Sequence, residues 1–313
     1  MKKNKEITDL AVVGGGPAGM TAALEASRLG LKVILIERKE LGGSLRLARK
    51  VANFPPWPPV AGSFLVGVFK KRIFSAGIKI LKDQVLRLKA PGHPQRCYNL
   101  MLKKFGQLMS RTVVLATGQD FFLPEGLNFK RETYFFPGEL DLYRLKRGSK
   151  VAITGGGEVA LDQALLYADW GAEVVVFSRS SLKANPELLK EVESSEVKIR
   201  LNAVLLSTRQ RISSGVVIEW VSASGEQYKE DFDYLVVACG KRPSLPGISG
   251  RIVFELPHSE DYPGVATRLP GLYLAGDLKN GQQRYVSLAV ADGLLAGYEA
   301  FKFIENMRKR GEL

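Results

Sequence analysis

The sequence predicts an α/β protein that contains two Rossmann-like folds of the three-layer ββα kind. Short apolar runs alternate with helical patterns along the chain, which favours parallel sheets covered by helices. A glycine-rich junction between a predicted strand and a predicted helix occurs twice, at Gly14–Gly19 and at Gly155–Ala160. The length of 313 residues suits two domains, since a domain has about 150 residues.

Each glycine-rich junction lies inside a β-α-β unit. In the first unit, residues 10–13 predict a strand, residues 18–29 a helix with small residues on its packing face, and residues 31–36 the next strand. The second unit repeats this order much later in the chain, with its strands and helix at residues 151–154, 159–170 and 173–177.

Further elements are expected within and after these units. Alternating apolar and polar residues predict antiparallel strands inserted into each fold, at residues 85–88, 98–102 and 216–221. Near the C-terminus, residues 272–277 read as a strand, and the alanine-rich residues 287–303 read as a helix.

The composition excludes several classes of protein. The net charge is +13, from 45 Lys and Arg against 32 Asp and Glu, but dense basic clusters occur only at residues 2–5 and 308–310. No zinc-finger, RNA-binding or helix-turn-helix signature accompanies them, so we expect no nucleic acid partner. No apolar run reaches the roughly 20 residues that span a bilayer, and the first apolar run is too short for a signal peptide. We therefore expect a cytoplasmic protein without a transmembrane segment.

Side chains that carry their own redox or metal chemistry are scarce. The only cysteines, Cys97 and Cys239, are too far apart in the sequence for a Cys-x-x-Cys pair or a zinc ligand set. The only histidines, His93 and His258, each neighbour a proline in loop-like sequence, and we expect no metal site. The chemistry must therefore come largely from bound cofactors.

The first glycine loop predicts a dinucleotide site. Gly14 permits the tight turn, Gly16 lets the backbone approach a pyrophosphate, and Gly19 lets the helix pack close to the strand. The phosphates would then bind at the helix N-terminus, where unpaired N–H groups favour anions. Glu37 ends the following strand, where a carboxylate can accept hydrogen bonds from an adenosine ribose.

The second glycine loop has the same glycine pattern, but a different residue ends the strand that follows its helix. Gly156 and Gly157 would bind the phosphates of a second dinucleotide, but the strand after the helix ends without an acidic residue. Arg179 and, slightly beyond it, Lys183 can instead face a 2′-phosphate, which favours NADPH over NADH. The alternative is that Arg179 is an ordinary surface residue of a loop.

Three more strand ends complete the pattern. Asp277 follows Gly276 at the end of the C-terminal strand, and its carboxylate is suited to the ribityl hydroxyls of a flavin. Residues 116–118 and 238–240 supply the small residues expected where a chain crosses between domains.

At this point the sequence resembles a flavoprotein of the thioredoxin reductase type over essentially its whole length. The resemblance rests on motifs in a fixed order: Gly14–Gly19, Gly42-Gly43, Asn53-Phe54-Pro55, Ala116-Thr117-Gly118, Gly155–Ala160, Gly240 with Pro243, and Gly276-Asp277. It implies a homodimer in which the NAD(P) domain is inserted into a discontinuous FAD domain. The implied segments are 1–118 and 245–313 for FAD, and 119–244 for NAD(P).

The resemblance also assigns the cofactor contacts. For FAD they are Gly14, Gly16, Pro17, Ala18, Gly19, Glu37, Arg38, Gly43, Ser44, Asn53, Val85, Ala116, Thr117, Gly118, Gly276, Asp277, Arg284, Tyr285 and Val286. For NAD(P) they are Gly156, Gly157, Glu158, Val159, Arg179, Lys183 and Gly240. No side chain is expected to be catalytic, because the cofactors carry the chemistry of hydride transfer.

Several positions depart from the thioredoxin reductase pattern. Residues 138–141, where that group has Cys-x-x-Cys, read Gly-Glu-Leu-Asp, and disulfide exchange requires a thiolate. The sequence in this respect is similar to the ferredoxin/flavodoxin–NADP reductases of the same type, which lack the dithiol. Ser44 replaces a glutamine usual in that group, Ser180 replaces a second arginine, and we expect no C-terminal aromatic lid over the flavin.

Two functions follow as expectations. The first is an FAD-dependent NAD(P)H oxidoreductase that is not a thioredoxin reductase and passes electrons to a non-dithiol acceptor. An acidic ferredoxin or flavodoxin would suit the net charge of +13. The alternative is a non-catalytic FAD-binding subunit or redox sensor with the same fold.

Overall fold

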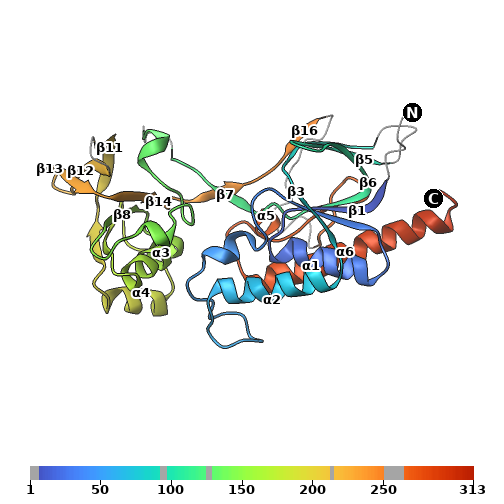
Figure 1. Cartoon of the computed structure of the whole chain (residues 1–313), viewed down its shortest axis with the longest axis horizontal. Coiled ribbons are helices and arrows are strands. Elements are labelled where there is room, and N and C mark those ends of the chain that lie inside the picture. The colour runs from blue at the N-terminus through green and yellow to red at the C-terminus, as the bar shows by residue number, and fades with distance from the viewer. Residues whose placement is uncertain (1–6, 92–96, 125–128, 212–214, 250–263) are drawn as a thin grey trace. The chain divides into compact units, whose positions relative to one another are not determined.

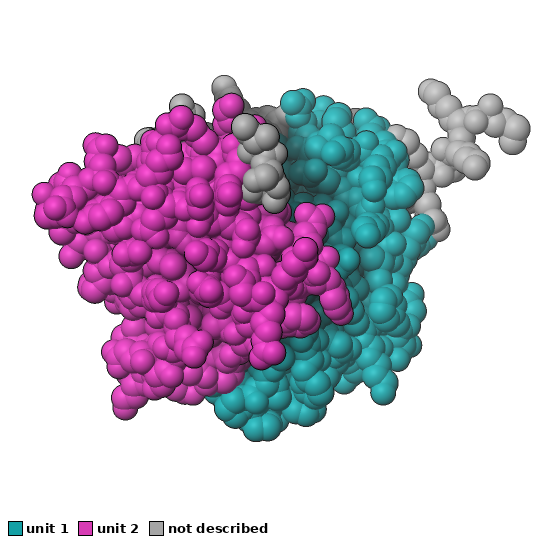
Figure 2. All heavy atoms as spheres, turned by 60° about the vertical axis from the view of Figure 1, so that its left-hand side comes forward, with its two compact units in different colours: residues 1–46, 51–119, 243–313 teal, residues 47–50, 120–242 magenta. Residues whose placement is uncertain are grey.

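The structure is a computed structural model that describes residues 7–91, 97–124, 129–211, 215–249 and 264–313. Both histidines and the basic residues 2–5 lie outside these ranges. The chain forms two compact units (Figure 2). Unit 1 comprises residues 1–46, 51–119 and 243–313, and unit 2 comprises residues 47–50 and 120–242.

Unit 1 is built on one mixed sheet with helices packed on it (Figure 1). The strand order is β16-β4-β5-β6-β1-β2-β3, and β17 also pairs with β6. The strands are β1 (Thr8–Val13), β2 (Val33–Glu37), β3 (Lys79–Lys82), β4 (Val85–Lys89), β5 (Tyr98–Leu102), β6 (Gly106–Leu115), β16 (Gly247–Ser249) and β17 (Leu272–Leu274). The helices are α1 (Pro17–Arg28), α2 (Gly62–Ser75), α5 (Asp277–Asn280) and α6 (Val286–Lys309), with a 3-10 helix at Gly43–Leu47.

Helices α1 and α6 pack closely because small residues face one another. A Cβ on Gly293 would overlap the carbonyl oxygen of Ala18, and a Cβ on Gly297 would lie 2.7 Å from the carbonyl oxygen of Ala22. Such contacts bring the two helix backbones together and hold α1 against α6.

Unit 2 has a four-stranded parallel sheet in the order β10-β9-β8-β14 and a three-stranded antiparallel sheet. The strands are β8 (Lys150–Thr154), β9 (Glu173–Ser178), β10 (Lys198–Leu201), β11 (Val204–Gln210), β12 (Val216–Val221), β13 (Gln227–Phe232) and β14 (Tyr234–Val237). Helices α3 (Glu158–Asp169) and α4 (Pro186–Glu193) cover the parallel sheet, and 3-10 helices occupy Arg131–Thr133 and Leu142–Arg144. Strands β7 (Gln119–Phe121) and β15 (Lys241–Pro243) pair where the chain enters and leaves this unit.

The predicted α/β class is confirmed, with a parallel β-α-β unit in each half of the molecule. Two predicted elements differ in extent: the helix expected at residues 287–303 continues as α6 to Lys309, and the strand expected at residues 272–277 ends at Leu274, with Asp277 already in α5. Gly276 adopts φ +71°, which ends the extended chain before Asp277. Residues 47–50 group with unit 2, although the predicted boundaries leave them inside the FAD segment. The assignment of each unit to a cofactor stays a prediction.

Within the described residues, no helix is both long and apolar enough to cross a membrane. The cytoplasmic location stays a prediction.

Candidate functional site

The first glycine loop is shaped by contacts that only glycine permits. Gly14 has φ +106°, and a Cβ there would overlap the carbonyl oxygen of Ala116. A Cβ on Gly19 would overlap the carbonyl oxygen of Gly14. The loop is therefore tight, and the first turn of α1 lies directly against the end of β1.

Other segments with predicted site residues converge on this loop. The N–H of Gly42 donates to the carbonyl oxygen of Gly15 at 2.7 Å, and a Cβ on Gly43 would lie 3.1 Å from the Cα of Gly16. A Cβ on Gly276 would lie 2.9 Å from the Cβ of Ala18. The structure thus brings together the ends of β1, β6 and β17 and the 3-10 helix after β2.

Glu37 lies beside the same loop. Its Oε2 accepts a hydrogen bond from the N–H of Gly15 at 2.6 Å, and its Oε1 accepts one from the N–H of Lys39 at 2.7 Å. The carboxylate is therefore held at the end of β2, the position at which it was predicted to receive a ribose.

Two polar features of the loop fit a dinucleotide. The N-terminus of α1 has no side-chain cap and no acidic residue in its first turn, so its N–H groups can receive phosphate. Thr117 follows Ala116, and its hydroxyl oxygen is shielded from solvent without a hydrogen-bond partner. A buried polar atom normally has a partner, and a bound flavin dinucleotide would provide one.

The remaining predicted FAD residues are spread around unit 1. Val85 is buried at the start of β4, Pro17 is the first residue of α1, and Asn53 is exposed. Tyr285 is half-exposed and precedes Val286, the first residue of α6. Exposed Arg38 follows β2, Ser44 lies in the 3-10 helix, Gly118 has φ +64°, and exposed Arg284 precedes α6.

The second glycine loop repeats the first within unit 2. Gly155 has φ +138°, and a Cβ there would lie 2.5 Å from the carbonyl oxygen of Ala238. Gly156 faces the Ser178 hydroxyl so closely that a Cβ would overlap it, whereas a Cβ on Gly157 would meet nothing within 4 Å. Gly157 is the N-cap residue of α3 and provides no side-chain cap, so the N–H groups of this helix N-terminus can also receive phosphate. Unlike α1, this helix has an acidic residue, Glu158, in its first turn.

Two exposed cations flank the second loop. Arg179 directly follows β9, and Lys183 is held on the loop by its N–H, which donates to the carbonyl oxygen of Gly156 at 2.7 Å. No ion pair with either side chain occurs among the described residues. Gly240 follows β14 with φ +137° and lies near the ring of Phe122.

Glu158, one of the predicted NAD(P) contacts, uses its carboxylate within unit 2. Its Oε1 accepts hydrogen bonds from the backbone N–H of Asn185 at 3.2 Å and from the Asn185 side chain at 3.1 Å. Asn185 caps α4 by accepting from the N–H of Leu188. Glu158 therefore fixes the loop that carries Lys183, while Val159 follows it in the first turn of α3.

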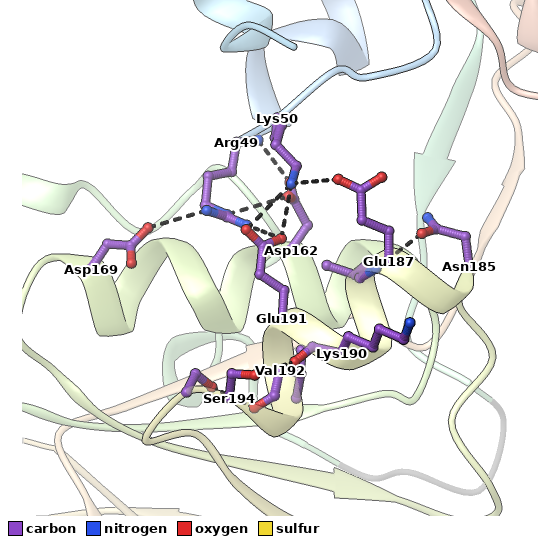
Figure 3. A network of polar contacts seen from close by, with 12 residues as sticks. Arg49, Lys50, Asp162, Asp169, Asn185, Glu187, Lys190, Glu191, Val192 and Ser194 are labelled. Atoms are coloured by element: carbon purple, nitrogen blue, oxygen red, sulfur yellow. Dashed lines mark hydrogen bonds and ion pairs between the residues drawn. The ribbon is translucent and has the colours of Figure 1, made fainter.

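A polar network of unit 2 was not predicted from the sequence (Figure 3). The Arg49 N–H donates to Asp162 on α3 at 2.8 Å, and its guanidinium lies 2.7 Å from Glu191 on α4. Lys50 pairs with Glu187 at 2.9 Å. The hydrogen bond from Arg49 lowers the pKa of Glu191, whereas burial raises the pKa of Asp162. Arg49 and Lys50 are more than 110 positions away in the sequence from the carboxylates that they contact, and no local pattern signals such contacts.

The two cysteines are partly buried, and residues 138–141 make contacts that stabilise the local structure. Burial raises the pKa of both thiols, and Cys239 also donates to the carbonyl oxygen of Thr154 at 3.4 Å. Gly138 has φ +79°, and Asp141 caps the following 3-10 helix by accepting from the N–H of Tyr143. Within the described ranges, no group of three His, Cys, Asp or Glu residues could hold a metal ion.

A comparison of the sequence with protein-family models identifies the family of the chain that carries these two loops. The model described as "Pyridine nucleotide-disulphide oxidoreductase" matches residues 8–293. The chain belongs to this family. It is accordingly an FAD-dependent oxidoreductase that uses a pyridine nucleotide, and the alternative of a non-catalytic flavin-binding subunit is not retained.

Individual relatives of this oxidoreductase are similar along the whole chain. Thioredoxin reductase of Aquifex aeolicus is 24% identical over 324 residues, covering 99% of this chain and 97% of that protein. Thioredoxin reductase 1 of Saccharomyces cerevisiae is 24% identical, covering 95% and 98%. The crystal structure of Lactococcus lactis thioredoxin reductase has a TM-score of 0.81 at 21% identity, with 96% and 99% of the chains covered. This structural likeness shows the shared fold.

These relatives correct one prediction. The expectation that the protein is not a thioredoxin reductase and serves a ferredoxin or flavodoxin is wrong, because the curated relatives over nearly the full length are thioredoxin reductases. That expectation gave decisive weight to residues 138–141 and a few cofactor contacts, whereas the similarity extends over both units.

Proposed function

We propose that this oxidoreductase uses NADPH as its electron donor, with FAD bound by unit 1 and NADPH by unit 2. The observation that carries the donor preference is the pair of exposed cations beside the second glycine loop, where the first loop has Glu37. A 2′-phosphate would be attracted to Arg179 and Lys183 and repelled by a carboxylate in the same place.

The residues of each unit have distinct tasks in this proposal. The N–H groups at the start of α1 would receive the pyrophosphate of FAD, and Glu37 would receive its adenosine ribose. The Thr117 hydroxyl would find its missing partner on the same cofactor. In unit 2, Gly157 would leave room for the NADPH phosphates at the start of α3. Bound FAD would supply the redox chemistry by accepting a hydride equivalent from NADPH.

The assignment of the units can be tested without measuring turnover. We expect the purified protein to contain FAD, and the FAD-loaded protein to be stabilised against heat by NADPH more than by an equal concentration of NADH. Thr117→Val should lower the FAD content and leave the NADPH-dependent shift intact in the remaining holoprotein. Equal stabilisation by NADPH and NADH would contradict the donor preference.

Thioredoxin is the acceptor to test first, because it is the substrate in the relatives' names. Turnover of thioredoxin with NADPH would extend the proposal to the oxidative half of the reaction. Lack of turnover would leave the assignment of FAD and NADPH untouched, since that assignment is tested by binding.

A homodimer belongs to the same proposal. Helix α6 exposes four large apolar side chains, namely Leu288, Leu294, Leu295 and Tyr298. Burial of these side chains against a second copy would remove apolar surface from water. Light scattering on the eluting protein should give twice the chain mass, and Leu295→Glu should shift it toward the monomer.

A further inference from the structure

Strands β4, β5 and β6 are antiparallel neighbours in the sheet of unit 1, where β5 and β6 are labelled in Figure 1. Val85 at the start of β4 is a predicted FAD contact, but the exposed residues that follow it and those of the turn between β5 and β6 are not among the predicted cofactor contacts. Residues 79–107 contain seven basic residues and one acidic residue, Asp83. The surface, here called the basic tip, consists of Leu86, Arg87, Met101, Lys103, Lys104 and Phe105.

Backbone hydrogen bonds fix the basic tip and bury its one acidic group. Both Lys104 and Phe105 donate their N–H groups to Asp83 at 3.0 Å, and Lys103 donates to the carbonyl oxygen of Gln84 at 2.9 Å. Asp83 is only 2% exposed. The turn between β5 and β6 is thereby held on the turn between β3 and β4. The Asp83 carboxylate is engaged by backbone N–H groups and also attracts Lys104, which leaves one carboxylate among several cations of these strands.

Apolar side chains are exposed among these cations. Phe105 is 61% exposed, Leu86 is 43% exposed and Met101 is 42% exposed. The pairing of β4 with β5 shifts register between Val85 and Arg87, and such a bulge leaves Leu86 and Arg87 together beside Met101. Among the described residues, none forms an ion pair with Arg87, Lys103 or Lys104.

We propose that the basic tip binds the surface of an anionic lipid membrane. A membrane surface offers negative headgroups to the lysines and an apolar boundary to Phe105, Leu86 and Met101 at the same time. Nucleic acid would satisfy the cations and could stack on Phe105, but it offers no apolar layer to Leu86 and Met101. The mixture of aliphatic and basic side chains therefore favours lipid.

The proposal is tested by sedimentation of the full-length holoprotein with vesicles. We expect binding to phosphatidylcholine vesicles that contain phosphatidylglycerol, weak binding to pure phosphatidylcholine vesicles, and loss of binding at high salt. Lys103→Glu combined with Lys104→Glu should lower the partition coefficient at least about twenty-fold, since each basic residue near such a surface contributes about fivefold. Phe105→Ser should lower it about tenfold without changing the salt dependence.

A matched control separates the contribution of the basic tip to vesicle binding from that of the overall net charge. Lys198→Glu combined with Lys229→Glu changes two exposed lysines of unit 2 and alters the net charge equally, and it should retain nearly all binding. All four lysines lie outside the proposed cofactor sites, so NADPH oxidation should be unchanged in both double variants.

Three results would overturn the proposal. The first is equal binding of the wild type to neutral and anionic vesicles, and the second is equal loss of binding in the two double variants. The third is absence of vesicle binding together with capture of an oligonucleotide through Lys103 and Lys104, which would reassign the basic tip to nucleic acid.

Discussion

The two glycine loops share a backbone design and differ in the residues around it. In both loops, the first glycine has a positive φ, with no room for a Cβ beside the end of a neighbouring strand. The first loop has the Glu37 carboxylate bound to Gly15, whereas the second has the Ser178 hydroxyl against Gly156 and the exposed Arg179 next to it. In the proposed function, the backbone makes each loop a phosphate site, and the residues at the end of the second strand select the ribose.

The largest expected effect on stability comes from substitutions at the sixth position of each glycine loop. This position is Gly19 in the first loop and Ala160 in the second. Gly19→Ala would force a Cβ into the carbonyl oxygen of Gly14, and we expect it to lower the free energy of unfolding by about 2–4 kcal/mol. Ala160→Gly creates no overlap and should cost only about 1 kcal/mol. Denaturant unfolding gives the free energy of unfolding of both variants for this comparison, and the FAD content of each purified variant is measured alongside.

Gly67 provides a control for this pair, because it lies inside α2 and a Cβ there would meet nothing within 4 Å. Gly67→Ala should stabilise the protein by up to about 1 kcal/mol through helix propensity. Similar losses of stability in all three variants would mean that the crowding at Gly19 has no special consequence.

The next effect concerns the choice of donor. Arg179→Ala removes a cation that would face the 2′-phosphate, so the dissociation constant of NADPH should rise about tenfold. The dissociation constant of NADH should stay within about twofold, because NADH has no phosphate at that position. Fluorescence titration with both nucleotides checks this, with Lys229→Ala as the control, and a parallel weakening of both nucleotides would contradict it.

The smallest expected effect on stability concerns how the helices after the two loops, α1 and α3, are held in place. Helix α1 is held by close contacts of small residues on α6, whereas α3 is held partly by Arg49 through Asp162 and Glu191. Arg49→Met should therefore lower the free energy of unfolding by about 1 kcal/mol at low salt, and by less at high salt. Denaturant unfolding at both salt concentrations tests this, and a salt-independent loss would argue against an electrostatic role.

The same variant should alter the response to acid. Since the Glu191 pKa is lowered in the folded protein, its stabilising contribution is present above its ordinary pKa and is lost as pH falls through the folded value. Without Arg49 only Lys50 still lowers the Glu191 pKa, so this contribution is reduced and the loss of stability on acidification should be smaller in Arg49→Met than in the wild type.

Sequence periodicity predicted the elements around both loops closely. The strand expected at residues 98–102 is β5, that at 216–221 is β12, and the helix expected at 159–170 differs from α3 by one residue at each end. These elements follow from local alternation and glycine placement, which short stretches of sequence contain. The convergence of Gly43 and Gly276 on the first loop was implied only through family resemblance.

Contacts between distant segments could not be predicted in this way. No periodic pattern links Arg49 to Glu191, and the attachment of Glu158 to Asn185 depends on how the loop after β9 folds back. The choice of acceptor was mispredicted for a related reason. Residues 138–141 were weighed as a local motif, while the relationship to thioredoxin reductases extends over the whole chain.

The central claim is that NADPH donates electrons to FAD held by the first loop. An anaerobic titration of the purified holoprotein with NADPH and, separately, with NADH tests it most directly by following the flavin absorbance. We predict rapid bleaching by NADPH at stoichiometric concentration and much slower bleaching by NADH. Equal rates with the two nucleotides, or an unchanged flavin spectrum with both, would contradict the account.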